Sequence, residues 1–278
     1  MKLTLTYQRS SSQTNNYICG PTVWRQEART TQQHEEVYMG NVIQTRHLRD
    51  ALNMAHSIQG SMETGPIGQI VGEPGTGKTW AGKWLARELG AVRVCCSHGI
   101  SNKALIVKLF EAFSGEGSPG STNSLLGRLE VIAASRLLIV DEANHLRWQQ
   151  LELLRYLADE AGMGLLLVGT ELMNRPFTDG RTATLLAQLA SRIGAKRVRF
   201  EHLTTLEDIA GYMIQPHFGK VDKATAQAFA RHAKGYWRDG AELAAACKRV
   251  MQTQKIETLS AVIVEAAANW MAPARALS

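Results

Sequence analysis

Eight consecutive residues constrain the fold of this chain more than any other feature. They fit the pattern of two glycines flanking four residues and followed by Lys and Thr, and they read Gly72, Glu73, Pro74, Gly75, Thr76, Gly77, Lys78 and Thr79. An apolar run at 67–71 precedes them, and residues 80–89 have helical apolar spacing. Such a turn between strand and helix points backbone N–H groups at phosphate oxygens. The segment predicts a phosphate-binding P-loop, with Lys78 reaching the β- and γ-phosphates and Thr79 ligating Mg²⁺.

A second motif downstream places two carboxylates at the end of an apolar run. Residues 137–140 are Leu-Leu-Ile-Val, and Asp141 and Glu142 follow. A continuous apolar run is typical of a central parallel strand, whose C-terminal end lies where α/β sheets bind ligands. We expect Asp141 to hold Mg²⁺ through water and Glu142 to polarise the attacking water. The structural alternatives are a glycine-containing turn and an acidic N-cap. The two motifs together favour nucleotide hydrolysis over nucleotide storage.

Length and composition set broader limits. A chain of 278 residues can bury a full core and hold one large domain with a smaller one. No apolar run approaches the roughly 18–20 residues of a membrane helix, and the N-terminus lacks a signal-peptide core, so we expect a cytoplasmic protein. The four cysteines do not predict a disulfide framework, and we interpret Cys95 and Cys96 as buried strand thiols rather than metal ligands. The net charge of +6 is compatible with a nucleic-acid partner, an acidic partner or neither.

The chain divides into three expected regions. Residues 1–36 are polar and read as a flexible arm that orders on a partner. Residues 37–200 alternate strand and helix patterns, which predicts an α/β nucleotide-binding domain with a parallel sheet flanked by helices. Strands are expected at 67–71, 91–96, 137–140, 165–168 and 197–200. Residues 201–278 carry only helical patterns and predict a small all-helical domain, with helices near 204–215, 222–233, 240–251 and 258–271.

The order of these parts resembles that of the AAA+ ATPases over roughly residues 41–271. That family has a P-loop α/β domain, an acid pair on the third core strand, a polar residue at the tip of the fourth, and a helical lid. Residues 141–146, Asp-Glu-Ala-Asn-His-Leu, are similar to the Asp-Glu-Ala-x-His-Leu signature of its transposition and secretion branch. Residues 167–172 are similar to the strand that follows in that branch. The branch includes the target-selecting ATPases of Mu-like phages and of Tn7- and Tn5053-type transposons.

The resemblance implies roles for further residues. Thr170 matches the sensor position, whose hydroxyl or amide hydrogen-bonds the attacking water or γ-phosphate, with a strand-ending turn residue as the alternative. Arg192 is similar to the Ser-Arg finger that enters a neighbouring subunit's site, with Arg181 as a competing candidate and a solvated arginine as the alternative. Arg238 matches the lid arginine that senses phosphate. The positions that contact DNA in the family correspond to Lys103 and Arg147, which would otherwise be solvated surface charges.

The function that the resemblance implies is ATP-dependent regulation of DNA transposition. Such a protein uses ATP and Mg²⁺, forms an ATP-dependent helical or ring oligomer on duplex DNA with little sequence preference, and directs a transposase to its target. Residues 1–40 do not accommodate the helix-turn-helix domain of Mu's own ATPase, so DNA contact would have to come from the core. The alternatives are another AAA+ role (replication initiation, helicase loading or ExeA-type secretion) and a non-hydrolysing nucleotide switch that binds a protein partner. Glu142 counts against the switch.

Overall fold

A five-stranded parallel sheet forms the centre of the first region. The computed structural model describes residues 43–278 except 65, 118–119, 179 and 276–278, so the expected arm at 1–36 lies outside the described residues. The strands are β1 (Ile67–Gly72), β2 (Val92–Cys95), β3 (Leu137–Asp141), β4 (Gly164–Gly169) and β5 (Arg197–Phe200). They pair in the order β2-β3-β4-β1-β5, and every pairing is parallel. The predicted α/β class and the five predicted strands are confirmed.

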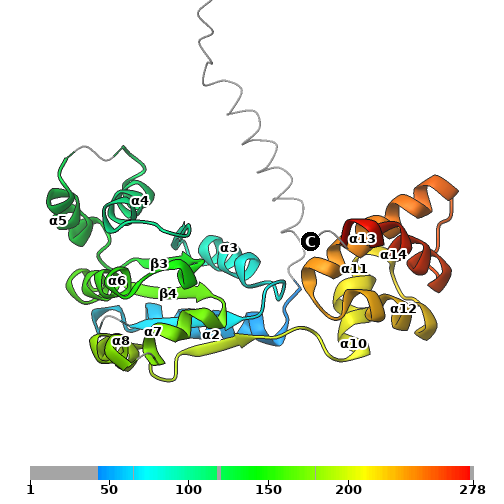
Figure 1. Cartoon of the computed structure of the whole chain (residues 1–278), viewed down its shortest axis with the longest axis horizontal. Coiled ribbons are helices and arrows are strands. Elements are labelled where there is room, and N and C mark those ends of the chain that lie inside the picture. Colours follow the sequence, from blue (N-terminus) through cyan, green and yellow to red (C-terminus); the bar gives the residue numbers. More distant parts are fainter. Residues whose placement is uncertain (1–42, 65, 118–119, 179, 276–278) are drawn as a thin grey trace, which may run out of the picture. The chain divides into compact units, whose positions relative to one another are not determined.

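The strand order brings the two sequence motifs together (Figure 1). β4 lies between β1 and β3, so the C-terminal ends of these three strands are neighbours. The P-loop follows β1, the acid pair ends β3, and Thr170 follows β4. All residues of β1, β3 and β4 are buried, as continuous apolar runs predict for central parallel strands.

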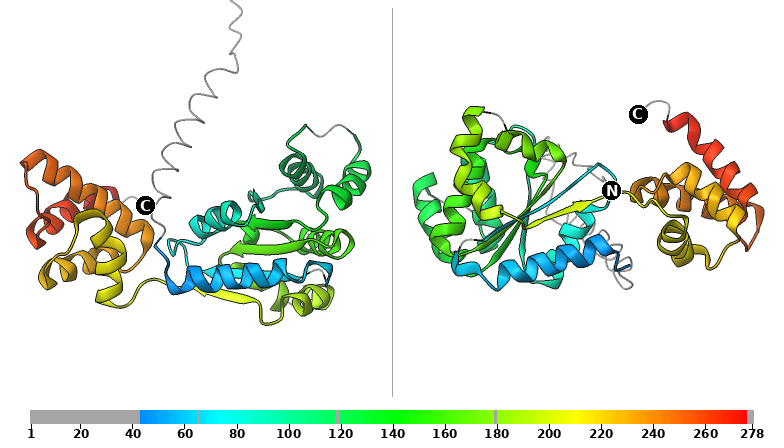
Figure 2. Two further views of the ribbon diagram at one scale, coloured as in Figure 1. Left: turned by 180° about the vertical axis from the view of Figure 1, so that it is seen from behind. Right: turned by 90° about the horizontal axis from the view of Figure 1, so that it is seen from below.

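Helices cover both faces of the sheet, which Figure 2 shows from two sides. α2 (Arg46–Gln59) and α3 (Lys78–Glu88) pack on one face, and α4 (Asn102–Ser114), α6 (Trp148–Ala161) and α9 (Ala187–Ile193) pack on the other. α5 (Thr122–Ile132) packs against α4 and α6. Gly68 lets α2 approach closely, because a Cβ at Gly68 would lie 2.7 Å from the side chain of Ile58.

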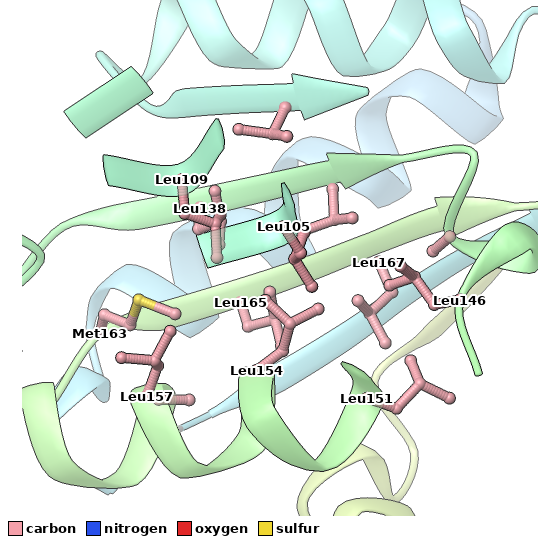
Figure 3. Close-up of a cluster of buried hydrophobic side chains, with 14 of the residues drawn as sticks. Leu105, Leu109, Leu138, Leu146, Leu151, Leu154, Leu157, Met163, Leu165 and Leu167 are labelled. Carbon is pink, nitrogen blue, oxygen red and sulfur yellow. The ribbon is translucent and has the colours of Figure 1, made fainter. Parts of the chain in front are cut away.

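A leucine-rich layer joins α4 and α6 to the sheet (Figure 3). Leu151, Leu154 and Leu157 of α6 point towards the strands. The other labelled residues of this cluster come from α4, β3 and β4 or the loops beside them: Leu105, Leu109, Leu138, Leu146, Met163, Leu165 and Leu167. Each fully buried leucine contributes about 1.5–3 kcal/mol of transfer free energy. This layer therefore holds β3 and β4, whose ends carry candidate site residues, in a fixed position.

Short helices fill the connection between β4 and β5. They are η3 (Glu171–Asn174), α7 (Arg175–Thr178), α8 (Gly180–Leu185) and α9; the remaining 3₁₀ turns are η1 (Met62–Thr64) and η2 (Ala143–His145). None of α7, α8 and α9 was among the expected elements, since each is too short to show a clear helical period.

Every described element after β5 is helical. These elements are α10 (Leu206–Ile209), the π-turn η4 (Ala210–Ile214), α11 (Gln215–Phe218), α12 (Lys223–Ala233), α13 (Trp237–Gln254) and α14 (Ala261–Arg275). They enclose a second apolar cluster around Phe229, Leu243 and Val264. Thr205 and Asp222 cap α10 and α12 by accepting backbone N–H groups. Among the described residues, no helix combines the length and hydropathy needed to cross a membrane.

Candidate nucleotide-binding site

The P-loop curls tightly between β1 and α3. Gly75 and Gly77 have φ of 83° and 92°, a left-handed conformation that glycine adopts far more readily than other residues. The Thr76 hydroxyl donates to the carbonyl of Glu73 across the loop at 2.8 Å. Gly77 is the N-cap of α3, so the loop leads directly into the helix N-terminus. This arrangement fits a phosphate-binding cradle.

Lys78 turns its amine back into this loop. Its Nζ donates to the carbonyl of Glu73 at 2.6 Å and lies 3.4 Å from the Thr76 hydroxyl. Burial lowers the pKa of Lys78, and the carboxylates of Glu142 and Asp141 partly offset this effect. The next residue, Thr79, is exposed in the first turn of α3. Phosphate oxygens are stronger acceptors for a cation than the carbonyl and hydroxyl, so the residues present fit a bound triphosphate.

The acid pair combines one buried and one accessible carboxylate. Asp141 is 1% exposed; its Oδ1 accepts the backbone N–H of Glu142 at 2.9 Å, and its Oδ2 accepts from Arg93 Nη2. Glu142 has a φ of 55°, and its side chain is 43% exposed. The Nε2 of His145 lies 3.9 Å from Glu142 Oε2. An accessible carboxylate beside a P-loop can accept a proton from water, which is the role expected of Glu142.

Thr170 lies at the tip of β4, between the P-loop strand and the acid strand. Its hydroxyl is buried and has no hydrogen-bond partner among the described residues. Its backbone N–H donates to Asn144 Oδ1 at 3.0 Å, which ties β4 to the turn after the acid pair. A Cβ at Gly169 would lie 2.7 Å from that same Oδ1, so the approach requires glycine. Buried hydroxyls are normally paired, so Thr170 fits a contact with a phosphate oxygen or water.

The start of α13 lies against the P-loop. The Trp237 N–H donates to the carbonyl of Gly75 at 2.9 Å, and a Cβ at Gly75 would lie 3.8 Å from Arg238 Cβ. Arg238 contributes to lowering the pKa of Lys78, although burial is the larger cause. The Tyr236 hydroxyl donates to Glu73 Oε2 at 2.5 Å. The structure thus places Arg238 beside the loop, and its contact with phosphate stays a prediction.

Arg192 lies far from this site. It belongs to α9 and forms an ion pair with Asp159 of α6 at 3.1 Å. It lines an open pocket together with Pro66, which precedes β1, whereas the P-loop follows β1. Six residues of strand separate the two ends of β1, a span of about 20 Å at 3.3 Å per residue. Arg192 therefore cannot reach the P-loop of its own chain. Arg181, the competing candidate, is exposed on α8.

The two candidate DNA-contacting residues are exposed on neighbouring helix starts. Lys103 lies in the first turn of α4, and Arg147 is the N-cap of α6. The buried side chain of Gln150 joins these segments, because it accepts from Arg147 N at 2.6 Å and donates to the carbonyl of Ile100 at 2.5 Å. A single buried amide thus fixes the spacing of the two helix starts.

Sequence reasoning missed the residues that hold the site together. No role was expected for Arg93, Asn144 or Gln150, although Asn144 belongs to the signature at 141–146. The strand pattern at 92–96 did contain a signal, because a charged Arg93 between two valines predicts a side chain on the opposite face. Our interpretation of the cysteines was half wrong: Cys96 is buried, but Cys95 is exposed.

Residues 61–176 match the family model described as AAA domain. This protein carries an AAA+ ATPase domain. The match includes the P-loop, the acid pair and Thr170. The sheet order and the helical elements after β5 agree with the AAA+ class that the sequence motifs predicted.

A short part of the chain is similar to a curated protein. It is 46% identical over 52 residues to the Mu-like prophage FluMu DNA transposition protein B of Haemophilus influenzae. The aligned segment covers 19% of this chain and only 18% of that protein.

Solved structures share the fold. The Thermotoga maritima RuvB P216G mutant is similar with a TM-score of 0.55 and 18% identity, over 80% of this chain and 68% of that one. NtrX from Brucella abortus in complex with ATP is similar with a TM-score of 0.54 and 18% identity, over 90% of this chain and 64% of that one. At these identities the likeness concerns the fold of the AAA+ region.

Proposed function

We propose that this protein is an ATP-dependent regulator of DNA transposition that oligomerises on duplex DNA and directs a transposase to its target. The observation that carries the proposal is the identity with a Mu-like transposition protein B, found in a chain with an AAA domain. The Asp-Glu-Ala-Asn-His-Leu signature at 141–146 supports the same branch.

In the proposed reaction the chain's residues bind nucleotide and activate water. The P-loop backbone and Lys78 bind the phosphates, while Thr79 and Asp141 hold Mg²⁺, which neutralises phosphate charge when bound. Glu142 accepts the proton of the attacking water. Thr170 orients that water or the γ-phosphate, and Arg238 contacts phosphate from the lid.

Assembly would complete the site. Because Arg192 lies beyond the opposite end of β1, it can stabilise developing charge only in a neighbouring subunit. We therefore propose that hydrolysis requires an oligomer, and that duplex DNA promotes the oligomer and raises turnover. The Arg192–Asp159 pair keeps the arginine ordered in the single subunit.

Lys103 and Arg147 are the proposed DNA contacts. Both are exposed, and Gln150 holds their helix starts together. Lone surface cations contact phosphates rather than base edges, so binding should show little sequence preference and fall steeply with salt.

The test is DNA affinity for two unrelated duplexes at several salt concentrations, with and without ATP. Lys103→Glu and Arg147→Glu should each weaken binding to both duplexes and reduce the slope of affinity against salt by about one per phosphate contact. The matched control is Lys223→Glu, an exposed lysine at the start of α12, which should bind as wild type does. Strong discrimination between the duplexes, or unchanged affinity in both variants, would refute this DNA surface. Turnover that does not respond to DNA would favour the non-hydrolysing switch or another AAA+ role.

A further inference from the structure

A largely buried ion pair involves the carboxylate that is expected to hold Mg²⁺ through water. Arg93 Nη2 lies 2.5 Å from Asp141 Oδ2, and the two side chains are 22% and 2% exposed. The other oxygen, Oδ1, accepts the N–H of Glu142 at 2.9 Å. Each oxygen of Asp141 therefore already has a protein donor.

The alternation of the strands explains this contact. Val94 and Val140 belong to the apolar cluster on the α6 side of the sheet, so their neighbours Arg93 and Asp141 point to the opposite face. Cys95 pairs with Asp141 in the β2–β3 register, so Arg93 reaches the carboxylate diagonally from two residues earlier. The opposite face is covered by α3, the helix that begins at the P-loop.

The ion pair offsets the cost of burying the Asp141 charge, and this compensation is needed only while no metal ion is bound. A carboxylate as deeply buried as Asp141 is costly unless a cation compensates it. Mg²⁺ held through water near this carboxylate would supply much of that compensation, and its charge would repel the guanidinium of Arg93. The Nε of Arg93 is buried and has no hydrogen-bond partner among the described residues, so the pair with Asp141 is the main anchor of this guanidinium.

We propose that Arg93 is a positioning residue that compensates Asp141 in the nucleotide-free protein and releases it when Mg²⁺ and nucleotide bind. The inference rests on Asp141 as the Mg²⁺ carboxylate, but it requires neither DNA nor a transposase. An Arg93–Asp141 ion pair that forms only in the nucleotide-free protein stabilises that form. Because binding of Mg²⁺ and nucleotide must break the pair, the pair lowers the affinity for them.

The experiment compares wild type with Arg93→Met, which keeps the apolar stem and removes the charge. Binding of a non-hydrolysable ATP analogue is measured at increasing Mg²⁺. The variant should need roughly tenfold less Mg²⁺ for half-maximal binding, the scale of one lost hydrogen bond to a charged group. In EDTA without nucleotide it should unfold at a lower temperature than wild type. An equal or higher Mg²⁺ requirement would overturn the proposal.

Three variants make the result specific. Arg136→Met removes another half-buried arginine, which lies just before β3 and donates to the carbonyl of Phe113 at 3.1 Å; its Mg²⁺ requirement should match wild type. Arg93→Lys keeps a cation with shorter reach and can be measured if Arg93→Met does not fold. Its Mg²⁺ requirement should lie between those of wild type and Arg93→Met, and a wild-type Mg²⁺ requirement in Arg93→Lys counts against the proposal. Asp141→Asn tests the underlying assignment. A wild-type Mg²⁺ requirement in Asp141→Asn would remove Asp141 as the metal carboxylate, whereas a shift there with none in the Arg93 variants would reject the role of Arg93 alone.

Discussion

At the scale of single residues, Glu142 has an unusual backbone. Its φ of 55° lies in the left-handed region, which costs a residue with a side chain about 1–2 kcal/mol. The turn that requires this conformation is held by the hydrogen bond from Glu142 N to Asp141 Oδ1 and by the contact of Asn144 with Thr170. The backbone thereby separates two adjacent carboxylates, one buried in the sheet and one accessible to water. Strain of this kind is typical of functional sites.

We expect Glu142→Gln to bind ATP as wild type does and to hydrolyse it about 10²–10⁴ times more slowly, because the amide keeps the size of the side chain but cannot act as a base. Steady-state phosphate release and nucleotide affinity check this. Glu88→Gln, an exposed glutamate at the end of α3, is the matched control and should retain full turnover. Equal turnover in wild type and Glu142→Gln would remove Glu142 from the reaction.

Arg192→Ala should bind ATP normally and lose hydrolysis in the assembled state, because the arginine lies at the far end of the sheet from its own P-loop. Its ion pair with Asp159 is partly exposed, so we expect a stability loss of no more than about 1 kcal/mol. Mixing Arg192→Ala with Glu142→Gln protein is the decisive measurement, since some interfaces then contain an intact glutamate and an intact arginine. Co-assembly without any recovery of turnover would mean that Arg192 does not act on a neighbour.

At the scale of elements, α6 positions more of the site than its sequence suggests. Its apolar face packs on β3 and β4, its first residues place Arg147, and Gln150 ties it to the loop before α4. The helix therefore connects the ends of β3 and β4 to the proposed DNA surface. Its contribution is mainly hydrophobic, because the leucines that face the sheet are fully buried.

Leu154→Ala should lower the free energy of unfolding by about 2–5 kcal/mol, since Leu154 is 0% exposed and the cavity left behind cannot fully collapse. Denaturant unfolding of the nucleotide-free protein measures this loss. Val131→Ala on α5, where the side chain is 75% exposed, is the control and should change the same quantity by less than about 0.5 kcal/mol. A similar loss in both variants would show that the layer in Figure 3 is not the core that carries stability.

At the scale of the whole molecule, the helical elements after β5 contact the P-loop through three kinds of interaction. Trp237 donates its backbone N–H to the carbonyl of Gly75, Tyr236 donates its hydroxyl to Glu73, and the Nδ1 of His202, which stacks on the Tyr236 ring, lies 4.0 Å from Glu73 Oε2. The hydrogen bond to Glu73 raises the pKa of Tyr236, so the phenol stays protonated and remains a donor at neutral pH. The conformation of the loop is thus coupled to the helices that follow β5.

Tyr236→Phe should leave the fold intact and increase amide hydrogen exchange in residues 75–79, because the loop loses one of its two hydrogen bonds to the start of α13. Exchange is followed by mass spectrometry on the nucleotide-free protein. Tyr156→Phe removes a comparable hydroxyl, which donates to Glu130 at 2.8 Å, and should not change exchange in the P-loop. Unchanged exchange in both variants would indicate that the loop is independent of Tyr236.

Local sequence patterns predict the five strands, the P-loop and the acid pair. Apolar runs, glycine spacing and terminal carboxylates are local signals, whereas the strand order comes from the structure. The sequence could not determine the partners of those residues. Arg93 and Asp141 are far apart in sequence, as are Tyr236 and Glu73, and Gln150 shows no motif. Such contacts depend on strand register and on the packing of separate helices, which a single sequence does not encode locally. The structure was needed to place Arg238 beside the P-loop and Arg192 beyond the other end of β1, because both residues lie far from β1 in sequence and their positions depend on how α13 and α9 pack.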